Sequence, residues 1–260
     1  MPHMNFKKSI FLLLTIGALY GCQHQAHTIK PNPAETSRLK TQIAAEYIRQ
    51  GDLDLAKRAL DEAIDRDSSN ALAKMMMAVT YQIDGGAKNL KLADEYYQRA
   101  VSTDPKEPQI RNNYGQYLFT LGRYEEAAKQ FVISGDTIEY TNRSFAYANL
   151  GQSYVKLNRM DEAKAAFLRA LRIDKKNPSA ILGLADLYYN QGAYDQAFEI
   201  YRSYMDIADA KMVDENGLIV GIRILNKTGD HMEMINLGGL LLQKFPNSNE
   251  ASEYRAKYKR

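Results

Sequence analysis

From residue 37 onwards the chain consists of short amphipathic stretches separated by brief turns. Apolar residues recur at intervals of three and four, the spacing that places them on one side of an α-helix. Gly51, Gly122, Gly192 and Gly229 stand between such stretches, where glycine can adopt the positive φ of a turn. The pattern predicts an all-α protein built from helix pairs that tight turns connect.

The helix pairs share one order of small and large side chains, as expected for internal repeats. In residues 144–177 this order is Gly151, Tyr154, Ala163, Phe167 and Ala170. Six copies of the pattern cover residues 37–70, 71–107, 108–143, 144–177, 178–214 and 215–248. Because the second copy is longer than the first, we predict that its additional residues lie in the turn at Asp84–Leu90.

This period and pattern identify the tetratricopeptide (TPR) repeat. Small residues let two helix axes approach to about 8–10 Å, and large residues fill the gaps between them. In this family the repeats stack into a right-handed superhelix, and their first helices line a groove that binds peptides. We therefore predict an all-α, right-handed TPR superhelix of six helix-turn-helix repeats, with a capping helix over residues 249–260.

The N-terminus has the layout of a secretory signal, which we place at residues 1–21. Lys7 and Lys8 precede an apolar run that is shorter than the ~20 residues of a membrane span. Cys22 is the single cysteine, and the preceding residues resemble a bacterial lipobox. We predict lipidation of Cys22; an ordinary or uncleaved signal with a chance cysteine is the alternative. Residues 22–36 are predicted to form a flexible tether.

The residue after the cysteine bears on localisation. Gln23 is not an aspartate, which by resemblance to enterobacterial lipoprotein sorting favours the periplasmic face of the outer membrane. Without Lys7 and Lys8 the 34 basic residues fall to 32, against 31 acidic ones. A nearly neutral chain has no excess of cations to bind nucleic acid.

The sequence contains no zinc-protease, phosphate-loop or nucleophile-elbow motif. His24 and His27 are two residues with no further metal ligand near them. We therefore expect no enzyme activity, no cofactor, no metal and no small-molecule substrate.

Candidate binding residues are those that the helix register assigns to the groove. An amide there can pair with the backbone of a bound chain, or simply bond to a neighbouring helix. An apolar stripe there marks an interaction surface, unless curvature buries its members. The candidates are Met75, Val79, Asn112, Asn113, Phe119, Phe145, Asn149, Val155, Leu182 and Tyr189.

Repeats three and four resemble the type IV pilus biogenesis and stability lipoproteins called PilF or PilW. The resemblance rests on the segment Asn112-Asn113-Tyr114-Gly115, on residues 122–127 (GRYEEA), on Tyr140 and on residues 149–151 (NLG). Many members of that family carry cysteines at the positions of Phe119 and Ser153. Here packing alone must hold both sites.

The resemblance implies an outer-membrane pilotin that helps the pilus secretin to reach the outer membrane and to multimerise. A general envelope adaptor that recruits peptidoglycan hydrolases or other envelope enzymes would use the same anchor and fold. An enzyme hidden within the repeats is the third class, although the repeats and cap occupy almost the whole chain.

Overall fold

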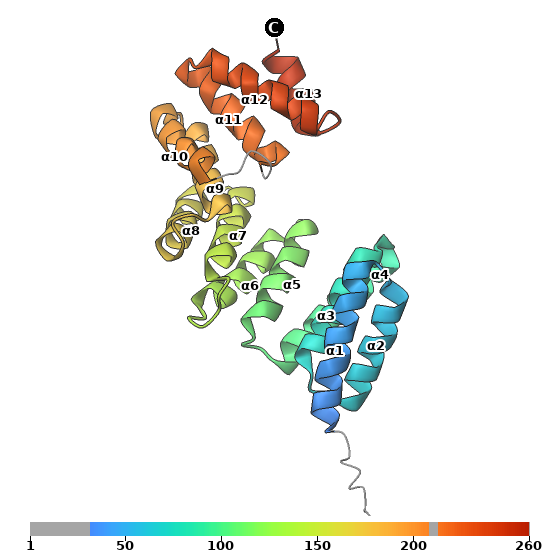
Figure 1. Ribbon diagram of the computed structural model, residues 1–260. Coiled ribbons are helices and arrows are strands. Elements are labelled where there is room, and N and C mark those ends of the chain that lie inside the picture. The colour runs from blue at the N-terminus through green and yellow to red at the C-terminus, as the bar shows by residue number, and fades with distance from the viewer. Residues whose placement is uncertain (1–31, 208–212, 260) are drawn as a thin grey trace, which may run out of the picture. The chain divides into compact units, whose positions relative to one another are not determined.

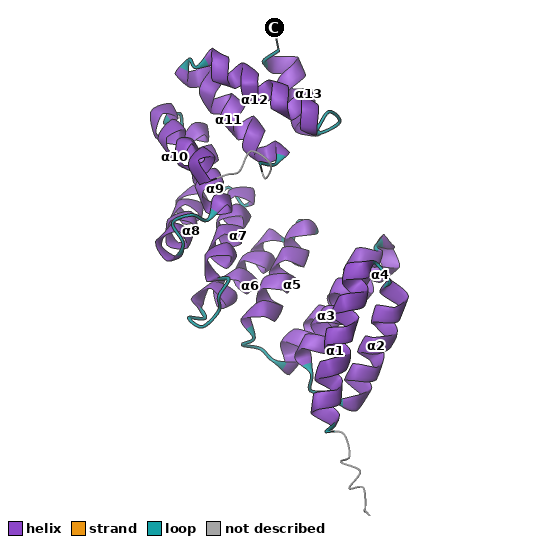
Figure 2. Cartoon of the chain, in the orientation of Figure 1, coloured by secondary structure: helices purple, strands orange, loops and turns teal. Residues whose placement is uncertain are grey.

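The computed structural model describes residues 32–207 and 213–259. All regular structure in these residues is α-helical, in thirteen helices (Figures 1 and 2). The helices are α1 (Pro33–Gln50), α2 (Leu53–Arg66), α3 (Ala71–Asp84), α4 (Gly86–Thr103), α5 (Pro108–Thr120), α6 (Tyr124–Asp136), α7 (Arg143–Lys156), α8 (Met160–Ile173), α9 (Pro178–Asn190), α10 (Tyr194–Ile207), α11 (Glu215–Thr228), α12 (His231–Lys244) and α13 (Asn249–Lys257). The all-α prediction is confirmed.

The helices form consecutive pairs, each with a first and a second helix, and the first helices lie side by side in chain order. Thus α1 contacts α3, α3 contacts α5, and the series continues through α7, α9 and α11 to α13. The predicted turn glycines Gly51, Gly122, Gly192 and Gly229 all have positive φ, between 74° and 90°. This is a tetratricopeptide arrangement, in which every pair buries its apolar faces against the pairs beside it.

Aromatic rings packed on glycines hold neighbouring helices close together. The Phe167 ring of α8 lies between Gly151 of α7 and Gly183 of α9, and a Cβ atom on either glycine would come within 2.5 Å of it. Phe131 of α6 has the same relation to Gly115 of α5, at 2.7 Å. The small positions of the repeat are therefore spaces for large side chains of the neighbouring helices.

Two predicted boundaries differ from the structure. Residues 33–36, assigned to the flexible tether, form the first turn of α1. Pro33 occupies the first helical position, where its missing N–H is not needed, and Glu35 forms an ion pair with Arg38. Residues 22–31 of the tether, including Cys22, and the signal segment lie outside the described residues.

The additional residues of the second repeat do not lengthen its turn. Helix α3 ends at Asp84 and α4 begins at Gly86, so that Gly85 alone separates them. The segment up to Leu90 instead extends α4 to 18 residues. Gly85 and Gly86 both have positive φ, which allows the chain to reverse within this short distance.

Within residues 32–207 and 213–259, no helix has the length and apolar character needed to cross a membrane.

Candidate functional site

Apolar side chains form a partly exposed stripe along α3, the first helix of repeat two. On α3, Leu72, Met76, Val79 and Ile83 follow one another at helical spacing, and Leu72 and Ile83 are 41% and 55% exposed. We call these four residues of α3 the apolar stripe. On α1, Leu39 and Ile43 are exposed to a similar degree, but they occupy another register position of the repeat. A row of partly exposed apolar groups along one helix is typical of an interaction surface.

The first helices of repeats three and four present amide side chains instead. Between α5 and α7 lie two hollows of about 430 Å³ and 640 Å³, and Gln116 borders both. We call the two hollows together the α5–α7 trough. Its main lining residues are Asn112, Asn113, Gln116, Phe119, Phe131, Asn149, Gln152 and Lys156.

The floor of the trough is apolar at one end. The buried Phe131 ring lies there, in the space that Gly115 leaves open, and Phe119 packs edge-on against Tyr124 with ring centroids 5.1 Å apart. The other end is polar, where Asn112 and Asn113 line it together with residues of the turn between α6 and α7. The trough therefore offers both apolar surface and hydrogen-bonding groups.

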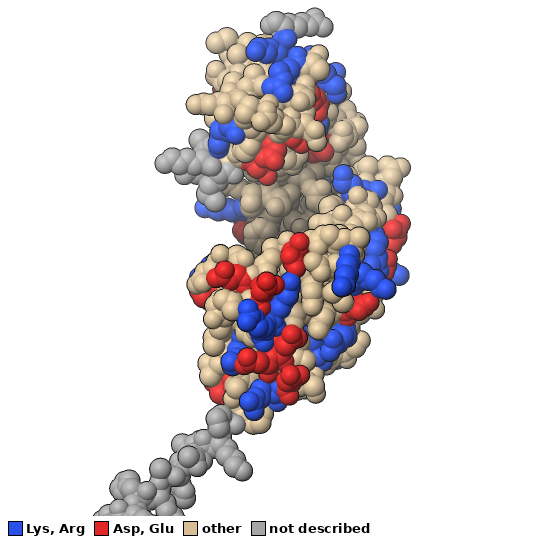
Figure 3. Space-filling model, turned by 90° about the vertical axis from the view of Figure 1, so that its right-hand side faces the viewer, with Lys and Arg blue, Asp and Glu red and all other residues tan. Residues whose placement is uncertain are grey.

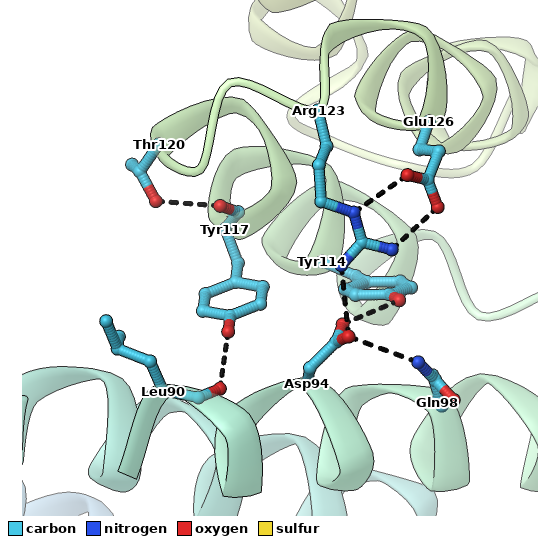
Figure 4. A network of polar contacts seen from close by, with 8 residues as sticks. All are labelled: Leu90, Asp94, Gln98, Tyr114, Tyr117, Thr120, Arg123 and Glu126. Carbon is cyan, nitrogen blue, oxygen red and sulfur yellow. Dashed lines mark hydrogen bonds and ion pairs between the residues drawn. The ribbon is translucent and has the colours of Figure 1, made fainter. Parts of the chain in front are cut away.

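A polar network fixes the helix that carries most of the trough. The Asp94 carboxylate of α4 accepts a hydrogen bond from the Tyr114 hydroxyl at 2.9 Å and forms an ion pair with Arg123 at 3.0 Å (Figure 4). Arg123 also donates two bonds to Glu126, both 2.7 Å long. Because Tyr114 belongs to α5 and Arg123 precedes α6, the network ties the third repeat to the second.

Charged residues replace the amides further along the first helices. Arg223 of α11 donates two hydrogen bonds to Glu253 of α13, at 3.1 Å and 2.5 Å. Its guanidinium also lies 3.8 Å from the Asp186 carboxylate of α9. Burial raises the pKa of Asp186, although Arg223 opposes the shift, whereas the bonds from Arg223 lower the pKa of Glu253.

Acidic and basic side chains are interspersed on the face of the molecule shown in Figure 3. Among the described residues, no three His, Cys, Asp or Glu side chains gather as a metal site. The absence of enzyme activity and of a cofactor stays a prediction from the sequence.

The structure separates the predicted groove residues into three groups. Met75 and Leu182 were predicted to face the groove but are core residues, with 2% and 7% exposure. Val79 belongs to the apolar stripe, and Phe145, 42% exposed, follows the spacing of Asn149 and Gln152 on α7. Val155 and Tyr189 are half-buried and pack against the hydrophobic core.

The predicted amides have different environments. Asn112 is buried, contrary to the exposed position that we predicted, yet it still borders the trough. The Asn113 amide donates to the Gln109 carbonyl oxygen at 2.8 Å, within its own helix. Asn149 borders the apolar end of the trough. The Asn113 bond is thus within α5 rather than to a neighbouring helix, and pairing of Asn112 or Asn149 with a bound chain stays a prediction.

Sequence reasoning missed most of the apolar stripe. Met76 lies one position after the predicted Met75, and Leu72 and Ile83 lie one helical turn or two from it. The signal was present in the spacing of Leu72, Met76, Val79 and Ile83, which is continuous over the whole of α3.

Paired helices with open first-helix surfaces define a repeat scaffold that binds other proteins. A family model described as tetratricopeptide repeat matches residues 41–81, 86–132 and 149–211. The type IV pilus assembly protein PilF of Pseudomonas aeruginosa is 30% identical, in an alignment that covers 97% of this chain and 99% of the relative.

Solved structures agree with that relationship. A structure of Pseudomonas aeruginosa PilF matches with a TM-score of 0.75 and 29% identity, over 86% of this chain and 98% of the other. PilW, described as a widely conserved type IV pilus biogenesis factor, matches with a TM-score of 0.72 and 27% identity, over 84% and 98% of the two chains. The chain therefore belongs to the PilF and PilW family of tetratricopeptide-repeat proteins.

Proposed function

We propose that this protein acts in type IV pilus biogenesis as a lipid-anchored pilotin of the outer membrane, which binds the pilus secretin and supports its localisation and multimerisation. The observation that carries the proposal is the relationship to the pilus assembly protein PilF over nearly the whole chain. The apolar stripe supplies a surface on which a protein partner can bury aliphatic side chains.

The anchor assigned to Cys22 divides the protein into two functional parts. An acyl chain on this cysteine would hold the repeats at the periplasmic face of the outer membrane. The repeats would then bind secretin subunits and bring them to the same surface. Each part can be removed without altering the other.

The decisive experiment compares three strains: one that lacks the gene, one that carries the Cys22→Ser variant, and one complemented with the wild-type gene. We expect the deletion to abolish detergent-resistant secretin multimers and surface pili. The Cys22→Ser protein should be found in the soluble periplasmic fraction, with secretin no longer enriched in the outer membrane. Normal secretin multimers in the deletion strain would refute the proposal.

The same strains distinguish the general envelope adaptor. Wild-type protein captured with its partners after crosslinking should carry secretin. Recovery of peptidoglycan hydrolases without secretin would assign the protein to the adaptor class instead. If the Cys22→Ser protein still fractionates with the outer membrane, lipidation at this residue is not the anchor.

A further inference from the structure

One side of α12, the second helix of repeat six, is apolar and open to solvent. Met232 and Ile235 are 73% and 54% exposed, and Gly239 and the half-buried Leu242 continue the same side at helical spacing. We call these four residues the α12 face. Among the described helices, α12 contacts only α11 and α13 (Figure 1), and its buried side chains face them. The α12 face therefore lies outside the groove of the first helices.

The second helices of the other five repeats carry charges where α12 has none. On α12 the five outward positions 232, 235, 236, 239 and 243 are all uncharged. At the position of Met232 the earlier repeats have a charged residue in every case: Asp54, Lys91, Glu125, Asp161 and Asp195. Charged side chains keep the outer side of a surface helix solvated, whereas an apolar side is typical of a contact with another protein.

Gly239 forms a hollow in the α12 face. Nothing lies within 4 Å of a Cβ atom placed on it, whereas the neighbouring Gly238 is covered by the Tyr254 ring of α13. Gly239 lies inside a helix and its φ is not positive, so the backbone does not require a glycine there. Glycine also weakens a helix interior relative to alanine. The hollow therefore accepts a side chain that the described part of this chain does not provide.

The α12 face is complementary to itself. Ile235 projects one helical turn before the Gly239 hollow. When two copies of α12 lie antiparallel, the Ile235 side chain of each copy lies opposite Gly239 of the other, and Met232 lies opposite Leu242. Such mutual pairing of residue with residue is the property of an interface around a two-fold axis. A glycine at the contact lets the two helix axes approach to about 8 Å.

The charges beside the α12 face favour the same arrangement. Glu233 and Lys244 are about three helical turns apart, so they lie on one flank of the helix at opposite ends. In an antiparallel pair, Glu233 of each copy lies near Lys244 of the other. The face between them has no charge that would be repelled by its own copy. This charge complementarity favours a second copy of the chain over an unrelated partner.

We propose that the α12 face is a self-association surface, on which a second copy of this protein packs antiparallel with Ile235 in the Gly239 hollow. One helix face is smaller than the ~800 Å² per partner of a stable complex, so the dimer forms at about 10 µM or above. The association does not depend on the proposed function. Secretin capture tests that function separately, through the apolar stripe of α3.

Sedimentation velocity of the Cys22→Ser protein, from about 5 µM to 500 µM, measures the association. The sedimentation coefficient should rise with concentration from the monomer toward the dimer. Ile235→Glu should weaken the dimer about tenfold or more, because it places two carboxylates at the two-fold contact. The matched control Leu168→Glu, at an exposed leucine on the second helix of repeat four, should dimerise as before. A monomer at every concentration, or equal effects of the two variants, would overturn the proposal.

Gly239→Met separates the contact from the stability of the helix. Methionine is a better helix former than glycine, so the variant should melt at or above the wild-type temperature. Its side chain fills the hollow that receives Ile235, so dimerisation should weaken severalfold. Unchanged or tighter dimerisation would show that the hollow is not the contact.

Cysteine crosslinking tests the antiparallel register. Cys22→Ser leaves the chain without cysteine, and Asn236→Cys then places one thiol of each copy near the two-fold axis. Mild oxidation should give a disulfide-linked dimer. Ala165→Cys, at the corresponding exposed position of α8, is the control and should stay monomeric. Equal crosslinking at both positions would contradict the register.

Charge reversal provides a second test of the same register. Glu233→Lys should weaken the dimer, because it places a lysine near Lys244 of the other copy. Glu233→Lys/Lys244→Glu should restore it, since each copy then presents the opposite pair. Melting temperatures near that of the wild type establish that both variants fold. A folded double variant that dimerises no better than Glu233→Lys would overturn the antiparallel arrangement.

Discussion

The side chain of Asn177 joins two successive repeats through Ser144. Its Nδ2 atom donates to the Ser144 hydroxyl at 2.8 Å, while its Oδ1 atom accepts the backbone N–H of Ala180 at 2.9 Å and so caps α9. The Ser144 hydroxyl in turn donates to the carbonyl oxygen of Ala170 at 3.1 Å. One buried amide therefore fixes both the start of α9 and its position against α7 and α8.

The same junction exists between the first two repeats, where Asn70 caps α3 and donates to Ser37 at 2.8 Å. Asn177 is fully buried and Asn70 is half-buried. Asn177→Ala should therefore cost about 1–3 kcal/mol, through the lost cap and the partners left unpaired. Asn70→Ala should cost less, because water can replace part of the lost bonding. Urea unfolding of both variants measures the difference, and a larger loss for Asn70→Ala would contradict this account.

Gly151 should not tolerate even one additional carbon. A Cβ atom there would lie 2.5 Å from the Phe167 ring, so Gly151→Ala should lower stability by about 1–3 kcal/mol. Gly239 of α12 is the matched control, because nothing lies within 4 Å of a Cβ placed on it. Gly239→Ala should raise stability by about 0.5–1 kcal/mol through helix propensity. Thermal unfolding of the two proteins should shift in opposite directions, and equal shifts would exclude the packing explanation.

Charge placed on the apolar stripe should weaken partner binding and leave the fold intact. The double variant Leu72→Glu/Ile83→Glu changes two exposed positions of α3, and partner capture should fall about tenfold or more, equivalent to 1.4 kcal/mol or more. Leu168→Glu, at a leucine of α8 that is 42% exposed, is the control and should bind normally. Equal capture by both variants would remove the stripe from the binding surface.

The two carboxylates around Arg223 should affect stability in opposite directions as pH changes. Burial raises the pKa of Asp186, so its protonated form contributes stability that is complete below the ordinary aspartate pKa and is lost as pH rises through the raised value. Asp186→Asn, which resembles the protonated form, should therefore melt above wild type at pH 7. The difference should disappear below about pH 4, near the unperturbed pKa.

Glu253 is the counterpart on α13. Hydrogen bonds from Arg223 lower its pKa, so its contribution is present above the ordinary glutamate pKa and is lost as pH falls through the lowered value. Glu253→Gln should therefore melt below wild type at pH 7, with the difference shrinking on acidification. Melting temperatures between pH 3 and pH 8 test both variants, and shifts of the same sign at pH 7 would contradict the assignment.

Much of the architecture was predictable from local patterns. The helix pairs, the positive-φ glycines and the termination of α4 at Thr103, before Asp104-Pro105, follow from rules that act over a few residues. The additional residues of the second repeat were misplaced, since the sequence does not say whether they lengthen a turn or a helix. The structure adds them to α4, where Leu90 packs against the hydrophobic core.

The repeat, the number of helix pairs and the kinds of side chain that each pair must bury follow from the amino-acid sequence. Which residue of a neighbouring pair is partly exposed depends on the tertiary structure: Met76 is half-buried whereas Met75 is buried, and Ile83 is exposed. Successive residues on a helix point about 100° apart, and an apolar side chain satisfies either the core or a partner surface equally well. Only the packing of the neighbouring repeats distinguishes those two environments. In the folded chain Asn112 is buried and Phe145 is exposed.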